Sequence, residues 1–558
     1  MTPNSSSPSS ALSRRGFLAS SAFATAGIAG GIPLLTACGG SGSKNEGTTT
    51  GENLKDLLPA YVASDLVAAD IPSKNGSAAG FTTAVPAGEL AVSVPKKLGK
   101  GSELTIMAPI YGTSPKQGNP YWTAMDEGAG VSVKWENQEG TTYGQKLGAV
   151  LASSSIPDAV VIPGWELMGK IPSAINNKFA DLGPYLTGDK VKDYPNLAAI
   201  PTAAWQRAVF GGKLRGLPMP GADTPNIAAF YRADLFKERG YEPPGTTKEF
   251  YDLCKELNAP KSRVWACGDM TWAAWNFFGV LPEKPYYWRL VDGKLVNRYE
   301  TDEYLEALAW SRTLYSAGFV HPDAKSESSD IGNLFSSGKV MMYNADLSDW
   351  YGKTVVQRVD NPKFAMAAMD YFAHDGGDPT LYTNAPSNMW CFASEKADEK
   401  TVVDLLALAN FTAAPYGSKE QRLRQFGVEG VHHTLADGVL SKNGTGNNQV
   451  FGTYEYLASP AAFLAYPDHP DVVEGMTGWQ QRQGAHLTRP LFYGMQIQEP
   501  NRYTALNSQF EDLEKDIVRG RKKVGDMKKA VSGWKSSGGD KLRDWYKKLL
   551  DETGDSAS

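Results

Sequence analysis

Three short β-rich runs between residues 104 and 163 constrain the fold of this chain more than any other feature. Leu104–Ala108 and Pro157–Pro163 are mainly apolar, which is typical of parallel strands buried on both faces. Between them, Val131–Trp135 alternates like a second strand, and residues 143–153 place leucine and valine on one face of a predicted helix. Strands and a helix joined by short connections form a βαβ unit, so we predict an α/β sheet.

The alternation of strands and helices continues along the chain. Thr246 and Glu249 have the spacing of a capping box, which predicts the start of a helix. Asp292-Gly293 predicts the turn of a hairpin over residues 288–299. Further strands are expected at 228–232, 340–343 and 364–367, and further helices over 301–318, 405–411 and 509–550. The chain of 558 residues is long enough for about two to four domains.

The first forty residues predict export from the cytoplasm. Arg14-Arg15 precedes an apolar stretch over residues 19–35, which is typical of a Tat-type signal, with Sec export as the alternative. Leu35-Thr36-Ala37-Cys38 resembles the bacterial lipobox, in which the cysteine carries the lipid. An uncleaved membrane helix is less favoured, because about 17 residues containing several Gly and Pro33 are short for a bilayer. We therefore expect residues 1–37 to be a Tat-type lipoprotein signal peptide and Cys38 to be lipidated. The protein is then anchored to the cell membrane by lipid, on the extracytoplasmic face.

Residues 38–100 are expected to lie outside the compact body. Residues 39–51 are rich in Gly, Ser and Thr and predict a flexible tether. Residues 53–100 have little periodicity. They are interpreted as an N-terminal extension that either wraps the body or is partly disordered.

The charge of the chain argues against a nucleic-acid partner. The formal net charge is −5, and the two arginines within residues 1–37 take the remainder to −7. The chain has no Lys/Arg block of the kind that contacts phosphates. No second apolar stretch is long enough to cross a membrane.

Cysteine and histidine give no sign of a disulfide framework, a metal site or a cofactor. Apart from Cys38, the chain has Cys254, Cys267 and Cys391, an odd number. Cys254 and Cys267 either pair or remain buried free thiols. None of the six histidines has the spacing of a zinc-ligand motif, so no metal is expected.

Several segments, in their order along the chain, carry a resemblance to a known family. They are residues 211–218, 230–236, 288–290 with 315–323, 335–342 and 517–546. Together with the lipobox, they resemble the family 1 extracellular solute-binding lipoproteins of bacterial ABC importers, of the large oligosaccharide-binding type. The resemblance covers residues 104–550. It departs from the family in the long 53–100 extension and in a larger segment at 411–433.

The resemblance implies a two-lobed periplasmic-binding-protein-like fold of the α/β class, with discontinuous lobes, a hinge and a central ligand cleft. Lobe one is expected at 101–225 plus 352–415, and lobe two at 226–351 plus 416–558. The implied partners are a carbohydrate or other small polar solute and the permease subunits of an ABC transporter. The protein is expected to act as a monomer.

A sugar cleft should combine flat aromatic rings with polar side chains, since sugars have apolar faces and many hydroxyls. This mixture occurs in several loops that follow predicted strands. The residues expected to bind ligand are Tyr111, Asn119, Trp122, Trp165, Trp272, Trp275, Asn344, Asp346, Trp350 and Asn384. Trp534 and Trp545 are assigned to packing.

Three functions remain open from the sequence. The favoured one is a binding protein that captures an oligosaccharide or sugar and delivers it to a permease without covalent chemistry. A binding protein for peptides or another polar solute would have the same fold. A secreted carbohydrate-active hydrolase or lyase is less favoured, because the chain has no GxSxG or metal motif and sequence cannot show a carboxylate pair at catalytic separation.

Overall fold

The computed structural model describes residues 47–64, 66–283, 286–326, 330–436 and 438–555, which belong to one compact unit, Ser43–Ser558. The expected signal peptide at 1–37 and Cys38 lie outside the described residues. None of the described helices combines the length and hydropathy needed to cross a bilayer.

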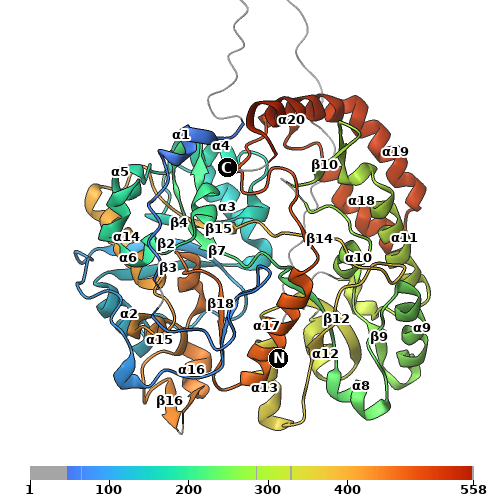
Figure 1. The fold of residues 1–558 in the computed structure, drawn as a ribbon, viewed down its shortest axis with the longest axis horizontal. Coiled ribbons are helices and arrows are strands. Elements are labelled where there is room, and N and C mark those ends of the chain that lie inside the picture. The colour runs from blue at the N-terminus through green and yellow to red at the C-terminus, as the bar shows by residue number, and fades with distance from the viewer. Residues whose placement is uncertain (1–46, 65, 284–285, 327–329, 437, 556–558) are drawn as a thin grey trace, which may run out of the picture. The chain divides into compact units, whose positions relative to one another are not determined.

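The first sheet has five strands in the order β3-β2-β4-β15-β7 and forms the centre of lobe one. The strands are β2 (Glu103–Ile110), β3 (Ser132–Glu139), β4 (Ala159–Pro163), β7 (Gly216–Pro220) and β15 (Ser387–Ala393). β2 runs parallel to β3 and β4, whereas β15 runs antiparallel to β4 and β7. Figure 1 shows these strands together with α2 (Pro120–Ala129) and α14 (Glu399–Thr412). The predicted βαβ unit is confirmed, with α3 (Tyr143–Ala152) as its helix.

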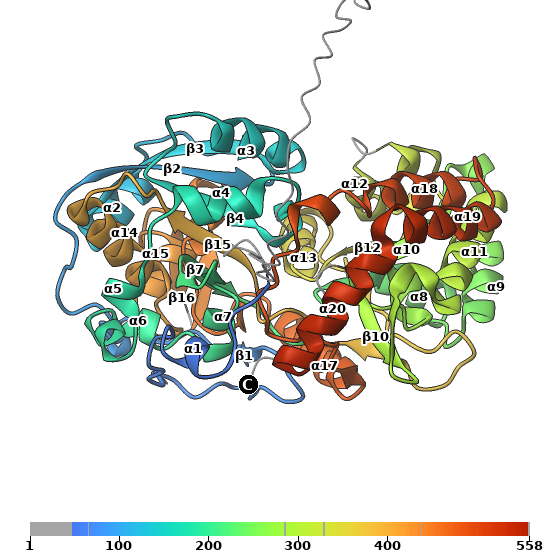
Figure 2. The same ribbon diagram turned by 90° about the horizontal axis from the view of Figure 1, so that it is seen from above.

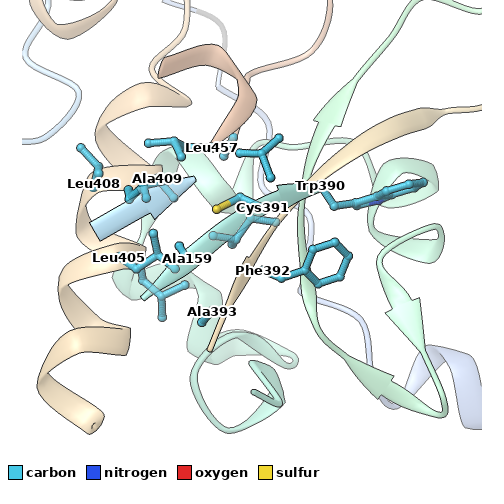
Figure 3. Packing of buried hydrophobic residues seen from close by; sticks show 14 of the residues in the cluster. Ala159, Trp390, Cys391, Phe392, Ala393, Leu405, Leu408, Ala409 and Leu457 are labelled. Atoms are coloured by element: carbon cyan, nitrogen blue, oxygen red, sulfur yellow. The ribbon is translucent and has the colours of Figure 1, made fainter. Parts of the chain in front are cut away.

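Strand β15 shows why this sheet is buried on both faces. Successive side chains of a strand point to opposite faces. In Figure 3, Cys391 points toward Leu408 and Leu457, whereas Trp390 and Phe392 point the other way. All five side chains are buried, so helix α14 covers one face and the second face is filled by aromatic rings.

The second sheet has the order β13-β8-β12-β9 and forms the centre of lobe two. Its strands are β8 (Ile227–Tyr231), β9 (Trp265–Cys267), β12 (Val340–Asp346) and β13 (Ala367–Ala368). The helices of this part are α8 (Ala233–Arg239), α9 (Thr247–Leu257), α10 (Thr271–Phe277), α11 (Asp302–Ser316), α12 (Ile331–Ser336), α13 (Asp349–Asp360) and α17 (Pro470–Gly484). β12 is parallel to β9 and antiparallel to β8.

A third core joins the C-terminal helices to a hairpin of lobe two. The hairpin pairs β10 (Trp288–Val291) with β11 (Lys294–Asn297). The predicted hairpin turn is confirmed, and its residues Asp292 and Gly293 both have positive φ, as a type I′ turn requires. Figure 2 shows α18 (Ser508–Val518) and α19 (Val524–Trp534) alongside α11, and α20 (Asp540–Thr553) follows. Trp288 and Trp534 are buried in this core, and Trp545 packs at its edge.

The remaining elements are short. In lobe one they are α4 (Ile171–Lys178), α5 (Gly183–Leu186), α6 (Pro195–Ala198), α7 (Thr202–Gln206), β5 (Val209–Phe210), β6 (Lys213–Leu214), α15 (Lys419–Phe426), β16 (His433–Ala436), β17 (Val439–Lys442) and α16 (Gly444–Gln449). β14 (Leu381–Tyr382) pairs with β19 (Leu487–Thr488). In the N-terminal extension, α1 (Gly51–Lys55) precedes β1 (Ala79–Phe81), which pairs in parallel with β18 (Phe463–Ala465).

The two-lobed fold is confirmed, but its boundaries differ from those expected. Residues 352–415 were expected in lobe one, and β15 and α14 do lie there, but β13 pairs with β8 and Phe364 is buried in the core of lobe two. Residues 416–458 were expected in lobe two, yet Phe451 and Tyr454 are buried in the core of lobe one. The chain crosses between the lobes at 221–226, 383–386 and 459–469. An apolar run predicts a buried strand or helix, but it carries no information about which of two sheets that element joins.

The structure contains no disulfide between Cys254 and Cys267 in its described part. Cys254, Cys267 and Cys391 are free and buried. No group of three or more His, Cys, Asp or Glu side chains in the described part of the chain is arranged to hold a metal ion.

Candidate functional site

Four adjoining cavities lie at or beside the boundary between the two lobes. We call them A, B, C and D; their volumes are about 470, 370, 420 and 180 Å³. Cavities A and B share Glu511 and Glu514, cavities B and C share Trp165 and Asn388, and cavities C and D share Tyr466. Because neighbouring cavities share lining residues, they form one groove.

Cavities B and C combine residues from both lobes. Trp165 and Asn388 of lobe one line both of them. Lobe two contributes Tyr299 and Glu511 to cavity B, and Asp346 to cavity C. A groove with walls from two lobes is the usual position of a ligand in a protein with a hinge.

Two tryptophans are exposed inside this groove. The described residues include all 14 tryptophans, and among them only Trp165 and Trp272 are classed as exposed, with 48% and 55% of their surface accessible. Trp165 lies in η3 (Gly164–Glu166) directly after β4 and lines cavities B and C. Trp272 lies in the first turn of α10, after β9, and lines cavity A. Large exposed apolar side chains in a concave surface mark a binding site more often than an accident of packing.

A network of hydrogen bonds fixes the start of α10 and therefore the position of Trp272. The side chain of Asp269 accepts hydrogen bonds from the Thr271 backbone N–H at 2.9 Å and from the Tyr315 hydroxyl at 2.8 Å. The Asn344 amide donates to the Asp269 carbonyl at 3.0 Å. Sheet, helix and loop are thus tied together at the edge of cavity A.

Trp275, one turn further along α10, also lines cavity A. Its ring stacks on Tyr304, with centroids 5.3 Å apart and planes 15° apart. The guanidinium of Arg298 lies 5.3 Å from the centre of the same indole. Because Tyr304 stacks on one face of the ring, Trp275 offers less free surface to a ligand than Trp272 does.

Carboxyl groups line the part of the groove formed by cavities A and B. Glu283, Glu511 and Glu514 line both cavities. Burial raises the pKa of Glu514 from 4.5 to about 7; Arg298 opposes this shift. The Tyr304 hydroxyl donates a hydrogen bond to Glu514. Burial, followed by repulsion from Glu283, also raises the pKa of Glu511.

Cavity C has polar side chains around an apolar floor. The Asp346 carboxylate accepts hydrogen bonds from the backbone N–H and hydroxyl of Ser348, at 2.9 and 2.6 Å. The Asn384 amide donates to the Thr224 carbonyl at 2.5 Å. Phe463, Leu464 and Met476 supply much of the apolar surface. This mixture suits a ligand that has both apolar faces and hydroxyl groups.

Three residues of the groove have a buried oxygen without a hydrogen-bond partner among the described residues. The atoms are Asn344 Oδ1, Gln496 Oε1 and Thr224 Oγ1. These residues line cavities A, B and C respectively. Buried polar atoms are normally satisfied, but similar atoms occur elsewhere in the described part of the chain, so these three do not by themselves mark the groove.

The structure brings six of the ten expected ligand residues together in the groove. They are Trp165, Trp272, Trp275, Asn344, Asp346 and Asn384. The other four do not line the four cavities. Tyr111 is exposed beyond β2, with its ring against Gly140. Asn119 caps helix α2 by accepting hydrogen bonds from the Tyr121 and Trp122 backbone N–H groups, at 2.9 and 3.1 Å.

Trp122 and Trp350 are core residues in this structure. Trp122 is 2% exposed and contacts Phe451, with ring centroids 5.3 Å apart. Trp350 is 7% exposed and contacts Phe230 at 5.8 Å. Both follow a strand in sequence, but each lies on a helix that places the indole in the core of its own lobe.

Several groove residues could not be recognised from sequence. Glu511 and Glu514 lie one turn apart on α18, a helix interpreted from sequence only as packing. Asn388 could have been suspected, because it is a polar residue in a mainly apolar strand, and the structure shows that it is exposed. Gln496 lies in an irregular segment and had none.

Comparison with known proteins places this fold in a family. The model of the bacterial extracellular solute-binding protein family matches residues 112–409, more than half of the chain. Lipoprotein LipO of Bacillus subtilis (strain 168) is 23% identical over 477 residues, which is 81% of this chain and 93% of LipO. The polygalacturonan/rhamnogalacturonan-binding protein YtcQ of the same organism is 21% identical over 305 residues, 52% of this chain and 59% of YtcQ.

Solved structures show the same fold at low sequence identity. The alginate-binding protein AlgQ2, without calcium ion, has a TM-score of 0.59 and 12% identity, covering 82% of this chain and 99% of its own. The N-glycan transport solute-binding protein NgtS of Streptococcus pneumoniae, in complex with Man1GlcNAc, has a TM-score of 0.57 and 14% identity, covering 81% and 99%.

Proposed function

Because the chain belongs to the bacterial extracellular solute-binding protein family, we propose that it captures an extracellular oligosaccharide in the groove between its lobes. The observation that carries this proposal is the pair of exposed indoles, Trp165 and Trp272, in separate cavities of one groove. Aromatic rings at two places suit a ligand with more than one sugar ring, since each apolar sugar face can pack on one indole.

The polar lining of the groove supports the same class of ligand. Carboxyl and amide groups at Glu511, Asn388 and Asp346 are placed along the groove and can accept or donate hydrogen bonds to hydroxyls. The names of YtcQ, AlgQ2 and NgtS each refer to a polysaccharide or glycan. A binding protein of this kind needs no covalent chemistry, because ligand contacts alone shift the population from open to closed lobes.

The cellular setting follows from the N-terminal sequence. Export by a Tat-type signal (1–37) and a lipid on Cys38 would hold the monomer at the outer face of the cell membrane. From there the closed, loaded protein would deliver its sugar to the permease subunits of an ABC transporter. The similarity to a protein named lipoprotein LipO supports this placement.

The test is a calorimetric titration of the soluble chain beginning at Gly39. The panel contains maltopentaose, cellopentaose, mannopentaose, tetragalacturonate and a tetrapeptide, and each ligand is re-isolated and weighed by mass spectrometry. We expect saturable binding of at least one sugar and its recovery intact. Binding of the peptide alone would favour a peptide carrier, and recovery of sugar fragments would show an enzyme.

A further inference from the structure

We propose that a strap in the N-terminal extension, residues 69–83, ties the two lobes together and forms part of the wall of cavity C. The restraint on the lobes is inferred only from the contacts that residues 69–83 make with them. Its effect on ligand affinity rests on the proposed function.

The chain on both sides of the strap is fixed to lobe one. Before the strap, the backbone N–H of Val62 donates to the Ala198 carbonyl at 2.9 Å, and Leu54 is buried in the core of lobe one. After the strap, Ala91 donates to the Gly417 carbonyl at 3.0 Å and accepts from the Lys419 N–H at 2.9 Å. Lobe one therefore holds both ends.

The strap itself lies on helix α17, which belongs to lobe two. The Gln481 amide donates to the Pro72 carbonyl at 3.0 Å, and the Asn75 amide donates to the Gln481 carbonyl at 3.1 Å. The backbone N–H of Ala78 donates to Gln480 Oε1 at 3.1 Å. Figure 2 shows β1 close to α17, whose side chains Met476 and Trp479 are buried in the core of lobe two. The extension therefore leaves lobe one, contacts lobe two and returns.

The strap has a defined internal structure. Ile71 and Gly80 exchange two backbone hydrogen bonds, at 3.0 and 2.8 Å, which close it into a hairpin. Its second arm, β1, pairs with β18 in the segment where the chain crosses between the lobes. At its end, Phe81 stacks on Tyr416 with ring centroids 4.1 Å apart. A segment with these contacts is part of the folded body.

Ala78 brings the strap to the ligand groove. It lines cavity C beside Gln480, Phe463 and Leu464. The backbone of the strap also meets the first crossing between the lobes, where the Asp223 N–H donates to the Gly76 carbonyl at 3.0 Å. Any relative movement of the lobes must therefore stretch or displace the strap, so the strap limits how far the groove opens.

Substitution at Gly80 tests the restraint, with Gly88 as the matched control. A Cβ at Gly80 would lie 2.8 Å from Thr477 Oγ1 and 3.1 Å from Val473 Cγ1, so Gly80→Val should lift the strap from α17. A Cβ at Gly88, in the same extension, meets nothing within 4 Å. If Gly80→Val fails to fold, Asn75→Gly with Gln481→Ala removes two strap contacts at the protein surface.

The readout is the distance between spin labels on cysteines that replace the exposed Lys146 of lobe one and Lys248 of lobe two, measured by double electron–electron resonance without ligand. The three described cysteines are buried, so labelling is selective. We expect one narrow distribution for the unsubstituted chain and for Gly88→Val, and a broader or longer one for Gly80→Val. Identical distributions for both valine variants would overturn the restraint.

The same variants are then titrated with the sugar panel described above. We expect Gly80→Val to bind the sugar about tenfold more weakly than Gly88→Val, since disordering a wall of the cavity adds an ordering cost to binding. Equal affinities would overturn the role of the strap in the groove. If no sugar binds any variant, the proposed function fails. The spin-label distances still decide whether the strap restrains the two lobes.

Discussion

At the scale of single residues, the tryptophans separate into two groups with different energetic roles. Trp122 and Trp350 are buried against Phe451 and Phe230, where their apolar area stabilises the fold. Trp165 and Trp272 leave about half of their surface in water. Such exposed area contributes little to folding but becomes favourable once a ligand covers it.

Replacement of Trp165 or Trp272 by alanine should therefore weaken ligand binding without destabilising the protein. We expect a loss of about tenfold in affinity for each, ~1.4 kcal/mol, measured by calorimetric titration. Trp122→Ala is the control and should lower the free energy of unfolding by about 3–5 kcal/mol in urea denaturation. Similar destabilisation by all three substitutions would show that Trp165 and Trp272 serve packing.

Glu514 should give the protein a pH-dependent stability. Its pKa is raised by burial from 4.5 to about 7. Between these pH values the folded protein binds more protons than the unfolded chain, so the free energy of unfolding should fall as pH rises through that range. Glu514→Gln keeps an acceptor for the Tyr304 hydroxyl and should remove this contribution, as measured by urea denaturation at a series of pH values.

Glu300 is a control, because its contribution to the free energy of unfolding should change with pH in the opposite direction. Burial alone would raise its pKa, but hydrogen bonds from Arg543 and Lys535 outweigh burial and lower it. The contribution of Glu300 should therefore be present at neutral pH and lost in acid, and Glu300→Gln should flatten the acid limb. If the pH profile of Glu514→Gln parallels that of the unsubstituted protein, the Glu514 carboxyl is not desolvated in the groove.

At the scale of secondary-structure elements, local signals in the sequence predicted individual helices and turns well. Thr246 caps α9 by accepting a hydrogen bond from the Glu249 N–H at 3.0 Å, although Glu249 itself accepts from Gly245. Thr301 caps α11, and Asp292-Gly293 forms the predicted turn. These features depend on residues a few positions apart, so they can be recognised without tertiary structure.

The orientation of helix α10 depends on a contact between distant residues, which gives a prediction at this scale. Tyr315→Phe removes the hydrogen bond to Asp269 but leaves the lining of the groove intact. We expect a loss of about 0.5–1.5 kcal/mol in stability, together with several-fold weaker ligand binding because Trp272 is less well held.

Tyr351→Phe is the matched control for this experiment. It removes a tyrosine–carboxylate hydrogen bond to Asp468, at 3.1 Å, from a residue that does not line the four cavities. The control should lose similar stability and keep its affinity. Equal affinities for the two variants would mean that the Asp269 network does not position the ligand site.

At the scale of the whole molecule, the sequence predicted the class of fold and some of the residues that line the candidate groove. Runs such as Leu104–Ala108 predict buried strands, because a short run that is almost wholly apolar is stable only when both faces of the strand are covered. The position of Phe364 in lobe two and of Phe451 in lobe one was not predictable, since both sheets bury the same kinds of residue. Glu514 was missed for a related reason: its carboxyl becomes unusual only when the packing of α18 buries it, which no local pattern shows.

The most direct test is a crystal structure of the soluble chain with the sugar selected by the titration. We predict density for sugar rings against the indoles of Trp165 and Trp272, within the groove formed by cavities A to C. The sugar should also contact Asn388, because this residue lines the two cavities that combine both lobes. A sugar bound elsewhere on the surface, with both indoles free, would contradict the groove as the ligand site.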